Sequence, residues 1–399
     1  MTYPTGRHFL QIPGPTNVPD RVLRAIDRAI IDHRGAEFAE LAKACLEGLK
    51  AVFRTRNPVI IFPSSGSGAW EAALVNTLNP GDKVLAYETG QFATLWSKMA
   101  ANLGLEVKFL PGDWRHGADA AAIGNQLAED RNREIKAVTV VHNETSTGIA
   151  SNIPAVRRAM DEAGHPALLM VDAISSLASI DYRHDEWGVD VTVSGSQKGL
   201  MLPPGLSFNA VSAKALEASK SSRLPKSYWR WDDMLANNVR GFFPYTPAIG
   251  LLYGLQEALR MLDEEGLPNV FRRHDRLAEA TRRAVRGWGL ELQACNPAEY
   301  SSSVTAVRMP EGFHEAEFRA VVLDRFNMSL GSGLGKVAGQ VFRIGHLGDL
   351  NELMLAGTLA GVEMGLEVVG VPHRKGGLNA ALDYLAEQAK AAASQGGAH

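Results

Sequence analysis

Short apolar runs alternate with longer amphipathic stretches through the middle of the chain, from about residue 58 to residue 220. Such runs are typical of buried strands, and we expect strands at 58–62, 83–87, 105–110, 135–141, 167–171, 189–194 and 206–211. Between them apolar residues recur at helical spacing, which predicts helices at 69–78, 92–103, 117–129, 153–164 and 212–220. The alternation predicts an α/β fold, with a mostly parallel seven-stranded sheet between two layers of helices.

The chain before this region predicts an arm and two helices. Residues 1–20 contain Ile12-Pro-Gly-Pro-Thr-Asn-Val-Pro19, which is too rich in proline for regular structure. This arm is either a solvated tail or a segment that packs near the functional site or on a second subunit. From residue 21 the apolar positions take helical spacing, and Glu37 to Phe53 predicts a second amphipathic helix. We place a large domain at 21–264.

The last third of the chain predicts a smaller domain. Residues 222–247 are aromatic and irregular, which suits an interface or the wall of a site. Pro247 is expected to open a helix through Leu262, followed by a helix to about Trp288. Shorter elements follow, with strands at 290–292, 304–307 and 341–344 and helices at 315–326 and 349–365. We expect a small α+β domain over 265–385 and a tail over 386–399, in which residues 391–399 should be frayed.

Composition narrows the class of protein. Of 399 residues 45% are hydrophobic and 21% charged, as in packed globular proteins. The net charge of -3 gives no reason to expect nucleic acid or an anionic membrane as a partner. The two cysteines, Cys45 and Cys295, suggest no disulfide framework, and no secretory signal or membrane-spanning run is visible. We therefore expect a soluble, cytoplasmic protein, and we predict no metal site.

Three strand ends carry residues of matching chemistry. Lys198 follows the strand at 189–194, Asp172 closes the strand at 167–171, and the loop Ser64-Ser-Gly-Ser-Gly68 follows the strand at 58–62. An amine, a carboxylate and a phosphate cradle are the parts of a pyridoxal phosphate site, in which the lysine forms a Schiff base and the aspartate holds the pyridine nitrogen protonated. Function in such folds gathers at the carboxyl ends of the strands, where these residues and Thr145 are expected.

Simpler interpretations of each residue stand beside this one. Lys198 alone resembles a solvated surface lysine, and Asp172 is also a candidate helix N-cap for the residues after it. Arg343, within the apolar run Val341-Phe-Arg-Ile344, suits either a strand-edge salt bridge or a fork for a substrate carboxylate. Three other motifs fail: the glycine spacing of a dinucleotide loop, the glycines around a nucleophilic serine, and the spacing of a P-loop.

Together these motifs resemble the class V, fold-type I pyridoxal-phosphate aminotransferases, especially the serine–glyoxylate and alanine–glyoxylate aminotransferases. The resemblance covers nearly the whole chain and rests on Pro13-Gly-Pro-Thr-Asn17, Ser65-Gly-Ser-Gly68, His142-Asn-Glu-Thr-Ser-Thr-Gly148, Val171-Asp172, Ser194-Gly-Ser-Gln-Lys198, Tyr245-Thr-Pro247 and Arg343-Ile-Gly345. Its most specific motif is the one that ends in Lys198.

The resemblance implies a role for each site residue. Lys198 would be the Schiff-base lysine, Asp172 the partner of the pyridine nitrogen, and Arg343 the clamp for the substrate carboxylate. The other implied cofactor contacts are Ser67, Gly68, Ala69 and Gln197 around the phosphate, Phe92 against the ring, Thr145 at the phenolic oxygen, and Ile174. Tyr245 and Thr246 would reach the site of the other subunit, so the implied active unit is a homodimer, alone or paired into a tetramer.

The implied reaction is ping-pong transamination between small-molecule amino and 2-oxo acids. L-serine and glyoxylate would give hydroxypyruvate and glycine, and alanine or a broader set of small amino acids is the alternative donor. Three other classes compete: a cysteine desulfurase, which needs a nucleophilic cysteine that residues 327–340 lack; a cofactor-binding scaffold without activity; and a dinucleotide oxidoreductase.

Overall fold

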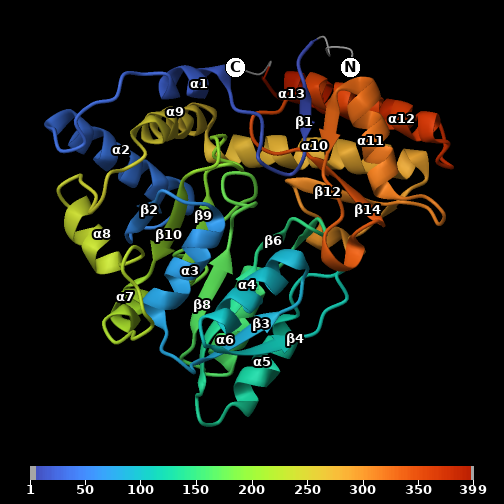
Figure 1. Cartoon of the computed structure of the whole chain (residues 1–399). Helices are drawn as coiled ribbons and strands as arrows, with labels where there is room; N and C mark the ends of the chain where they lie inside the picture. Colours follow the sequence, from blue (N-terminus) through green and yellow to red (C-terminus); the bar gives the residue numbers. More distant parts are fainter. Residues whose placement is uncertain (1–5, 397–399) are drawn as a thin grey trace.

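A seven-stranded sheet forms the centre of the computed structural model, which describes residues 6–396 (Figure 1). Its strand order is β2-β10-β9-β8-β5-β3-β4. The strands are β2 (Val59–Phe62), β3 (Lys83–Tyr87), β4 (Glu106–Leu110), β5 (Ile135–Val141), β8 (Leu168–Asp172), β9 (Val191–Gly195) and β10 (Ser207–Val211). Only β10 runs antiparallel to its neighbours, so the prediction of a mostly parallel sheet is confirmed.

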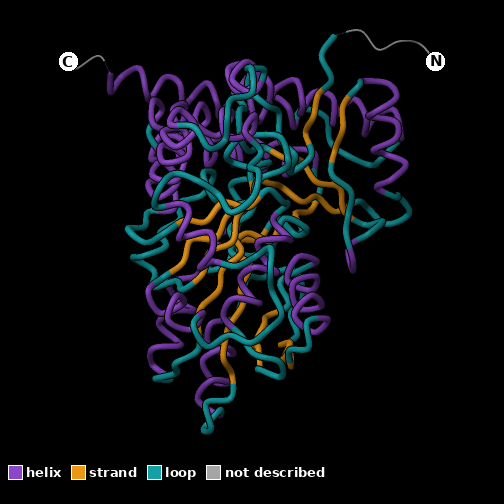
Figure 2. Tube along the Cα trace, turned by 60° about the vertical axis from the view of Figure 1, so that its left-hand side comes forward, coloured by secondary structure: helices purple, strands orange, loops and turns teal. Residues whose placement is uncertain are grey.

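Two layers of helices cover the sheet because both of its faces carry apolar side chains, as β2 illustrates. Its residues Val59 and Ile61 enter one hydrophobic core, and Ile60 and Phe62 enter another on the opposite face. The first core also takes side chains from α2 (Ala36–Phe53), α5 (Ala120–Glu129), α6 (Ile153–Glu162) and α9 (Ile249–Glu265). The second takes them from α3 (Gly66–Thr77), α4 (Gln91–Asn102), α7 (Ala213–Ser219) and α8 (Trp231–Asn238). Figure 2 shows the strands between these layers.

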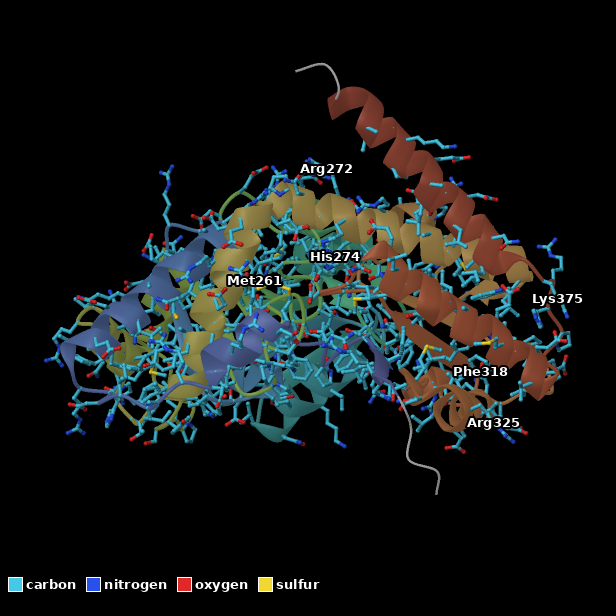
Figure 3. The ribbon with its side chains drawn as sticks, turned by 90° about the horizontal axis from the view of Figure 1, so that it is seen from above. Met261, Arg272, His274, Phe318, Arg325 and Lys375 are labelled. Atoms are coloured by element: carbon cyan, nitrogen blue, oxygen red, sulfur yellow. The ribbon has the colours of Figure 1, made fainter. Side chains whose placement is uncertain are left out.

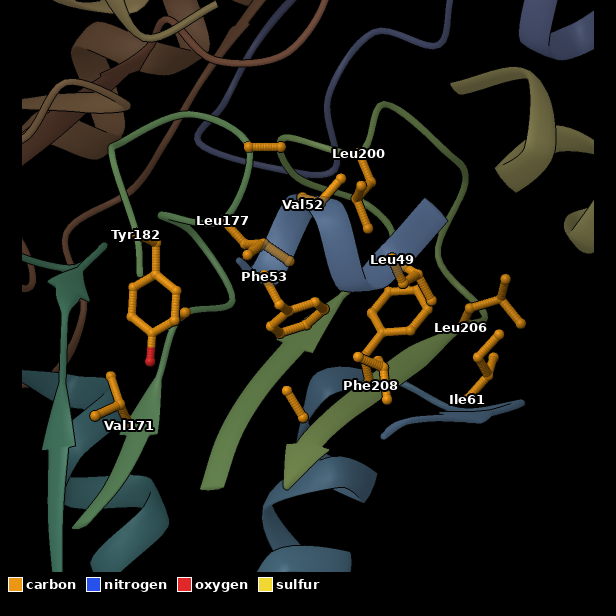
Figure 4. Packing of buried hydrophobic residues seen from close by; sticks show 14 of the residues in the cluster. Leu49, Val52, Phe53, Ile61, Val171, Leu177, Tyr182, Leu200, Leu206 and Phe208 are labelled. Atoms are coloured by element: carbon orange, nitrogen blue, oxygen red, sulfur yellow. The ribbon is translucent and has the colours of Figure 1, made fainter. Parts of the chain in front are cut away.

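Aromatic packing joins the first helical layer to the sheet. Phe53, near the end of α2, meets Phe208 of β10 edge to face, with ring centroids 6.5 Å apart. Leu49 and Ile61 lie beside the same pair (Figure 4). Because both faces are buried in β2, β5, β8, β9 and β10, most of these strands read as nearly continuous apolar runs, which is why the sequence located them. The edge strand β4 is partly exposed and contains Glu106 and Lys108.

The small domain is built around a three-stranded antiparallel sheet in the order β11-β12-β14. Its strands are β11 (Glu291–Leu292), β12 (Val304–Arg308) and β14 (Val341–Gly345), and its helices are α10 (Leu267–Trp288), α11 (Glu315–Phe326), α12 (Glu352–Val369) and α13 (Gly377–Gly396). Seen from above in Figure 3, α10 with His274 lies between α9 with Met261 and α11 with Phe318. Helix α10 thus links the two domains.

The N-terminal segment is an arm that packs on the chain itself. Its strand β1 (Phe9–Gln11) pairs in parallel with β13 (Met328–Leu330) of the small domain. After β1 the arm crosses to the large domain, where the backbone N–H of Thr16 donates to the carbonyl of Gln197 at 3.1 Å. Helix α1 (Asp20–Ile26) follows and packs on α9. For residues 9–16 of the arm, the solvated-tail alternative is therefore wrong; residues 1–5 lie outside the described part.

Other local predictions differ from the structure. Residues 222–247 contain the helix α8, whose Trp231 and Met234 are buried in the second core. Helix α13 continues through the tail as far as Gly396. Its packing in the small-domain core ends at Leu385, residues 386–393 are exposed, and residues 397–399 lie outside the described part. The hairpin of β6 (Asn143–Glu144) and β7 (Ile149–Ala150) was too short to predict. Within residues 6–396, no helix combines the length and hydropathy needed to cross a membrane.

Candidate active site

A cavity of about 180 Å³ lies beyond the carboxyl ends of β5, β8 and β9, at the edge where the sequence placed the site. Seven of the predicted site residues line it: Ser67, Phe92, Thr145, Asp172, Ile174, Gln197 and Lys198. Gly14 and Pro15 of the arm, together with Trp70, Asn143 and Ser175, complete much of its wall. Segments far apart in the sequence thus meet because parallel strands end on one side of the sheet.

Lys198 projects from the turn after β9 and is 9% exposed. Its Nζ donates a hydrogen bond to the carbonyl of Pro13 in the arm. A Cβ atom at Gly14 would lie 2.5 Å from this Nζ, and Gly14 has φ +104°, so the close approach of the arm requires glycine. Burial and, to a smaller extent, the positive charge of Arg343 lower the pKa of Lys198 to about 7, against the opposing effect of Asp172. The amine is therefore poised to exchange a proton near neutral pH.

Asp172 is the last residue of β8 and is buried. Its Oδ1 accepts from the backbone N–H of Ile174 at 2.7 Å, and its Oδ2 accepts from the indole Nε1 of Trp70 at 3.0 Å. Burial raises the pKa of Asp172 to about 7 and the nearby Glu144 adds to this effect, whereas both hydrogen bonds oppose it. The residues after Asp172 form turns and not a helix, so it is not a helix N-cap.

The first turn of α3 faces the cavity through Gly66 and Ser67. No side chain among the described residues caps this helix, so N–H groups of its first turn remain to bind an anion together with the helix dipole. The N–H of Gly68 donates to the carbonyl of Ser65 at 2.9 Å. Ala69 is fully buried in the core, where its carbonyl accepts from Asn209. Gly68 and Ala69 thus lie behind the cavity wall.

A cluster of hydroxyl and amide groups lies beside Thr145. The Oγ1 of Thr145 donates to Ser175 Oγ at 2.7 Å, and the same oxygen accepts from Asn143 Nδ2 at 2.8 Å. Asn143 and Ser175 were not among the predicted site residues. The signal for Asn143 was its place directly after an apolar strand, between His142 and Glu144.

Arg343 lies on β14 of the small domain and is 7% exposed. Its Nε donates to the carbonyl of Ser332 at 2.7 Å, and its Nη1 donates to the carbonyl of Thr145 at 3.0 Å. Within the described residues it forms no salt bridge, so the strand-edge ion pair is not what holds it. Burial lowers its pKa to about 10, and Glu144 opposes the change. The guanidinium is held by neutral carbonyls next to Thr145, and its charge remains for an anionic ligand.

Glu144 fixes the aromatic wall of the cavity and was missed by sequence reasoning. Its carboxylate accepts from the backbone N–H groups of Phe92 and Ala93, at 3.3 and 3.1 Å, in the first turn of α4. It also accepts from Ser146 Oγ at 2.6 Å. Burial raises the pKa of Glu144, and these hydrogen bonds oppose the shift. A residue of the hairpin therefore caps a helix some fifty positions earlier, a contact that no local pattern reveals.

Tyr245 and Thr246 lie away from this cavity within the chain. The ring of Tyr245 stacks on Tyr228 with centroids 4.2 Å apart, and its hydroxyl donates to the carbonyl of Tyr228. Thr246 lines a separate small cavity with Phe243 and Ile61. The role that the resemblance implies for them, contact with a second subunit, stays a prediction.

Comparison with known proteins agrees with a site of this kind. The family model described as aminotransferase class-V matches residues 8–343. The chain belongs to the class-V aminotransferases. It is an enzyme that transfers an amino group between small amino and oxo acids, and its α/β architecture is the fold-type I architecture of that family.

Three relatives illustrate the range of this aminotransferase family. A serine–glyoxylate aminotransferase of Methylorubrum extorquens is 52% identical, over 96% of this chain and 97% of that protein. An L-aspartate–glyoxylate aminotransferase of Paracoccus denitrificans is 46% identical, over 97% and 98%. The crystal structure of a ureidoglycine–glyoxylate aminotransferase from Bacillus subtilis is similar with a TM-score of 0.88 and 26% identity, over 96% and 100%. The names share an acceptor and differ in the donor.

Proposed function

We propose that this aminotransferase uses pyridoxal 5'-phosphate to transfer the amino group of L-serine to glyoxylate, which gives hydroxypyruvate and glycine. The observation that carries the proposal is that Lys198 and Asp172, two buried charged groups, line one cavity, and that the buried Arg343 donates to the carbonyl of Thr145 in its wall. The donor is supported by the serine–glyoxylate aminotransferase at 52% identity. Alanine and other small amino acids are the alternative donors.

The polar groups that line the cavity fit this cofactor. Asn143 Oδ1 and Gln197 Oε1 are buried polar atoms without a hydrogen-bond partner in the described part of the chain, and both residues line the cavity. A polar molecule bound there would relieve the cost of leaving them unpaired. The first turn of α3, with Ser67, would hold the phosphate, and Phe92 would lie against the ring. Gly68 and Ala69 belong to the same turn but do not line the cavity, so they would support the phosphate site through the backbone. Ile174 completes the cavity wall beside Asp172.

When bound, pyridoxal phosphate supplies an electron sink for the charge that develops at the substrate α-carbon. The protein supplies the rest. Asp172 holds the ring nitrogen in its protonated form, and Thr145 hydrogen-bonds the phenolic oxygen. The Arg343 guanidinium binds the substrate carboxylate through two parallel hydrogen bonds, which orients the α-carbon. Lys198, whose pKa burial lowers to about 7, takes the proton from that carbon at Nζ and would deliver it to the cofactor carbon that receives the amino group, within the same half-reaction.

The active unit is a homodimer, alone or paired into a tetramer, in which Tyr245 and Thr246 complete the cofactor site of the partner. Their location outside the cavity of their own chain supports this arrangement. The domain limits are 21–264 and 265–385. They are supported by the helix break at Gly266, where a φ of +77° ends α9 just before α10 begins. The protein acts in the cytoplasm, which its two free cysteines support.

The absorption spectrum of the purified protein tests the proposal. Bound pyridoxal phosphate should give a visible band that L-serine bleaches and glyoxylate restores. Bleaching by alanine or aspartate but not by serine would overturn the donor and leave the cofactor in place. If no band forms after incubation with pyridoxal phosphate, the roles assigned to the cofactor and to Lys198 are wrong.

A further inference from the structure

Two tryptophans stack beside the cavity, and in the described part of the chain only one of them donates its indole N–H to a charged group. Trp70, in α3, and Trp96, in α4, stack with ring centroids 5.9 Å apart and an interplanar angle of 13°. They are 3% and 2% exposed. Trp70 lines the cavity, and its ring also meets Phe92 at 6.4 Å. The indole N–H of Trp96 has no acceptor among the described residues, whereas that of Trp70 donates to Asp172 Oδ2 at 3.0 Å.

Both partners of the Asp172 carboxylate are pure donors. An indole N–H and a backbone N–H can donate a hydrogen bond but cannot accept one. Each therefore stabilises the ionised carboxylate over the protonated acid, against the effect of burial. Because they engage different oxygens, they also fix the rotation of the carboxylate, and each oxygen keeps a free lone pair for a further donor.

We propose that Trp70 is a positioning residue that keeps Asp172 ionised and correctly oriented to accept the N–H of a pyridinium ring. The proposal rests on the role assigned above to Asp172. Packing alone does not account for the contact, because an aromatic side chain without an N–H would fill the same space. Trp96 shows that this core tolerates a buried indole whose N–H has no acceptor, so core packing by itself does not require the N–H of Trp70 to have one.

The pair supplies a matched experiment with W70F and W96F. Each substitution replaces one of the two stacked indoles by a phenyl ring, but only W70F removes a hydrogen-bond donor to Asp172. Each protein is freed of cofactor, and the dissociation constants of pyridoxal phosphate and of its 1-deaza analogue, with C–H in place of the ring nitrogen, are measured by equilibrium dialysis. The analogue cannot present an N–H to Asp172, so it reports packing alone.

We expect W70F to weaken pyridoxal phosphate about tenfold or more, the usual effect of losing a hydrogen bond to a charged group, and to leave the analogue nearly unchanged. W96F should change the two constants by the same small factor. Equal weakening of both ligands in W70F, or equal behaviour of W70F and W96F, would overturn the proposal. If W70F does not fold, replacement of Trp70 by benzothienylalanine, which has sulfur in place of the indole N–H, gives the same comparison.

A third variant separates this inference from its premise. D172N should lose affinity for pyridoxal phosphate but not for the analogue. If D172N binds both ligands as the unmodified protein does, the role of Asp172 is wrong and the role of Trp70 falls with it. If D172N discriminates between the ligands and W70F does not, Asp172 keeps its role and only the inference about Trp70 fails.

Discussion

The two sides of the site, the cavity wall in the large domain and the neighbouring Arg343 side in the small domain, hold their charged groups by different means. In the large domain, Asp172 ends β8 and is the register partner of Val193 on β9, the strand that leads to Lys198. Sheet hydrogen bonds therefore set the relative positions of the carboxylate and the amine. In the small domain, Arg343 lies within a strand of a different sheet and stands next to the cavity, where it donates to the carbonyls of Ser332 and of the cavity residue Thr145. One side is fixed by the sheet, and the other depends on how the domains dock.

A glycine-rich loop mediates this docking. Residues 331–337 run beside β14 and supply the carbonyl of Ser332 to Arg343. At the far end of the loop, Lys336 forms an ion pair with Glu88 of the large domain and lies 5.5 Å from the ring of Trp114. Trp114 also donates to Glu88 at 3.0 Å. The loop thus connects the position of Arg343 to contacts made on the large domain.

The largest effect is expected at the large-domain side. K198A removes the amine that both anchors the cofactor and moves the proton, so kcat should fall by about 10⁴-fold or more. Steady-state transamination between serine and glyoxylate is the measurement, and circular dichroism checks the fold. K220M, which changes an exposed lysine outside the site, is the matched control. Full activity in K198A would contradict the assignment.

The small-domain side should respond in a different parameter. R343Q removes the charged fork for the substrate carboxylate, and two lost charge-assisted hydrogen bonds correspond to a loss in kcat/KM of about 10²-fold or more. R343K keeps the charge but not the fork, so it should recover only part of the loss. The visible band of bound pyridoxal phosphate should persist in both variants. Loss of that band together with activity would show that Arg343 supports the cofactor instead.

The buried amine also predicts a pH dependence of stability in the protein freed of cofactor. The folded-state pKa of Lys198 is about 7 against an ordinary value of 10.5, so between these values the unfolded chain binds a proton that the folded chain does not. The free energy of unfolding should therefore rise with pH across this window, by up to about 1.4 kcal/mol per pH unit from this group.

K198M should lack this rise. The variant should exceed the unmodified protein in stability at pH 7, and its advantage should shrink toward pH 10, as measured by urea unfolding at several pH values. Stability curves of the two proteins that run parallel across the window would show that the amine is not desolvated.

The smallest effect is expected from the loop contact between the two sides. Lys336 is 61% exposed, so its ion pair with Glu88 should contribute at most about 1 kcal/mol. K336M should raise the KM for serine up to about fivefold and change kcat little, because it loosens the loop that holds Arg343. A double-mutant cycle with E88Q measures the coupling, and K220M breaks an exposed ion pair elsewhere as a control. If the effects of K336M and E88Q on the KM for serine are additive, the ion pair does not affect the site and the prediction is wrong.

The sequence by itself determined the strands of the central sheet and the residues that close them. Val59, Ile60, Ile61 and Phe62 read as one apolar run because both faces of β2 are buried, and the same rule located the strands that lead to Asp172 and Lys198. The convergence of their carboxyl ends follows from parallel strand order, so the position of the site could be predicted before its geometry was known.

Only the tertiary structure decided which groups support these residues. Trp70 and Asp172 are 102 positions apart, and Glu144 caps a helix 51 and 52 positions before it. Pro13 meets Lys198 across 185 positions, and Arg343 meets Thr145 across 198. Periodicity reports whether a position faces a core, but a hydrogen bond depends on the distance and angle between two atoms. Those are set by how separate elements pack, which no local pattern in the sequence contains.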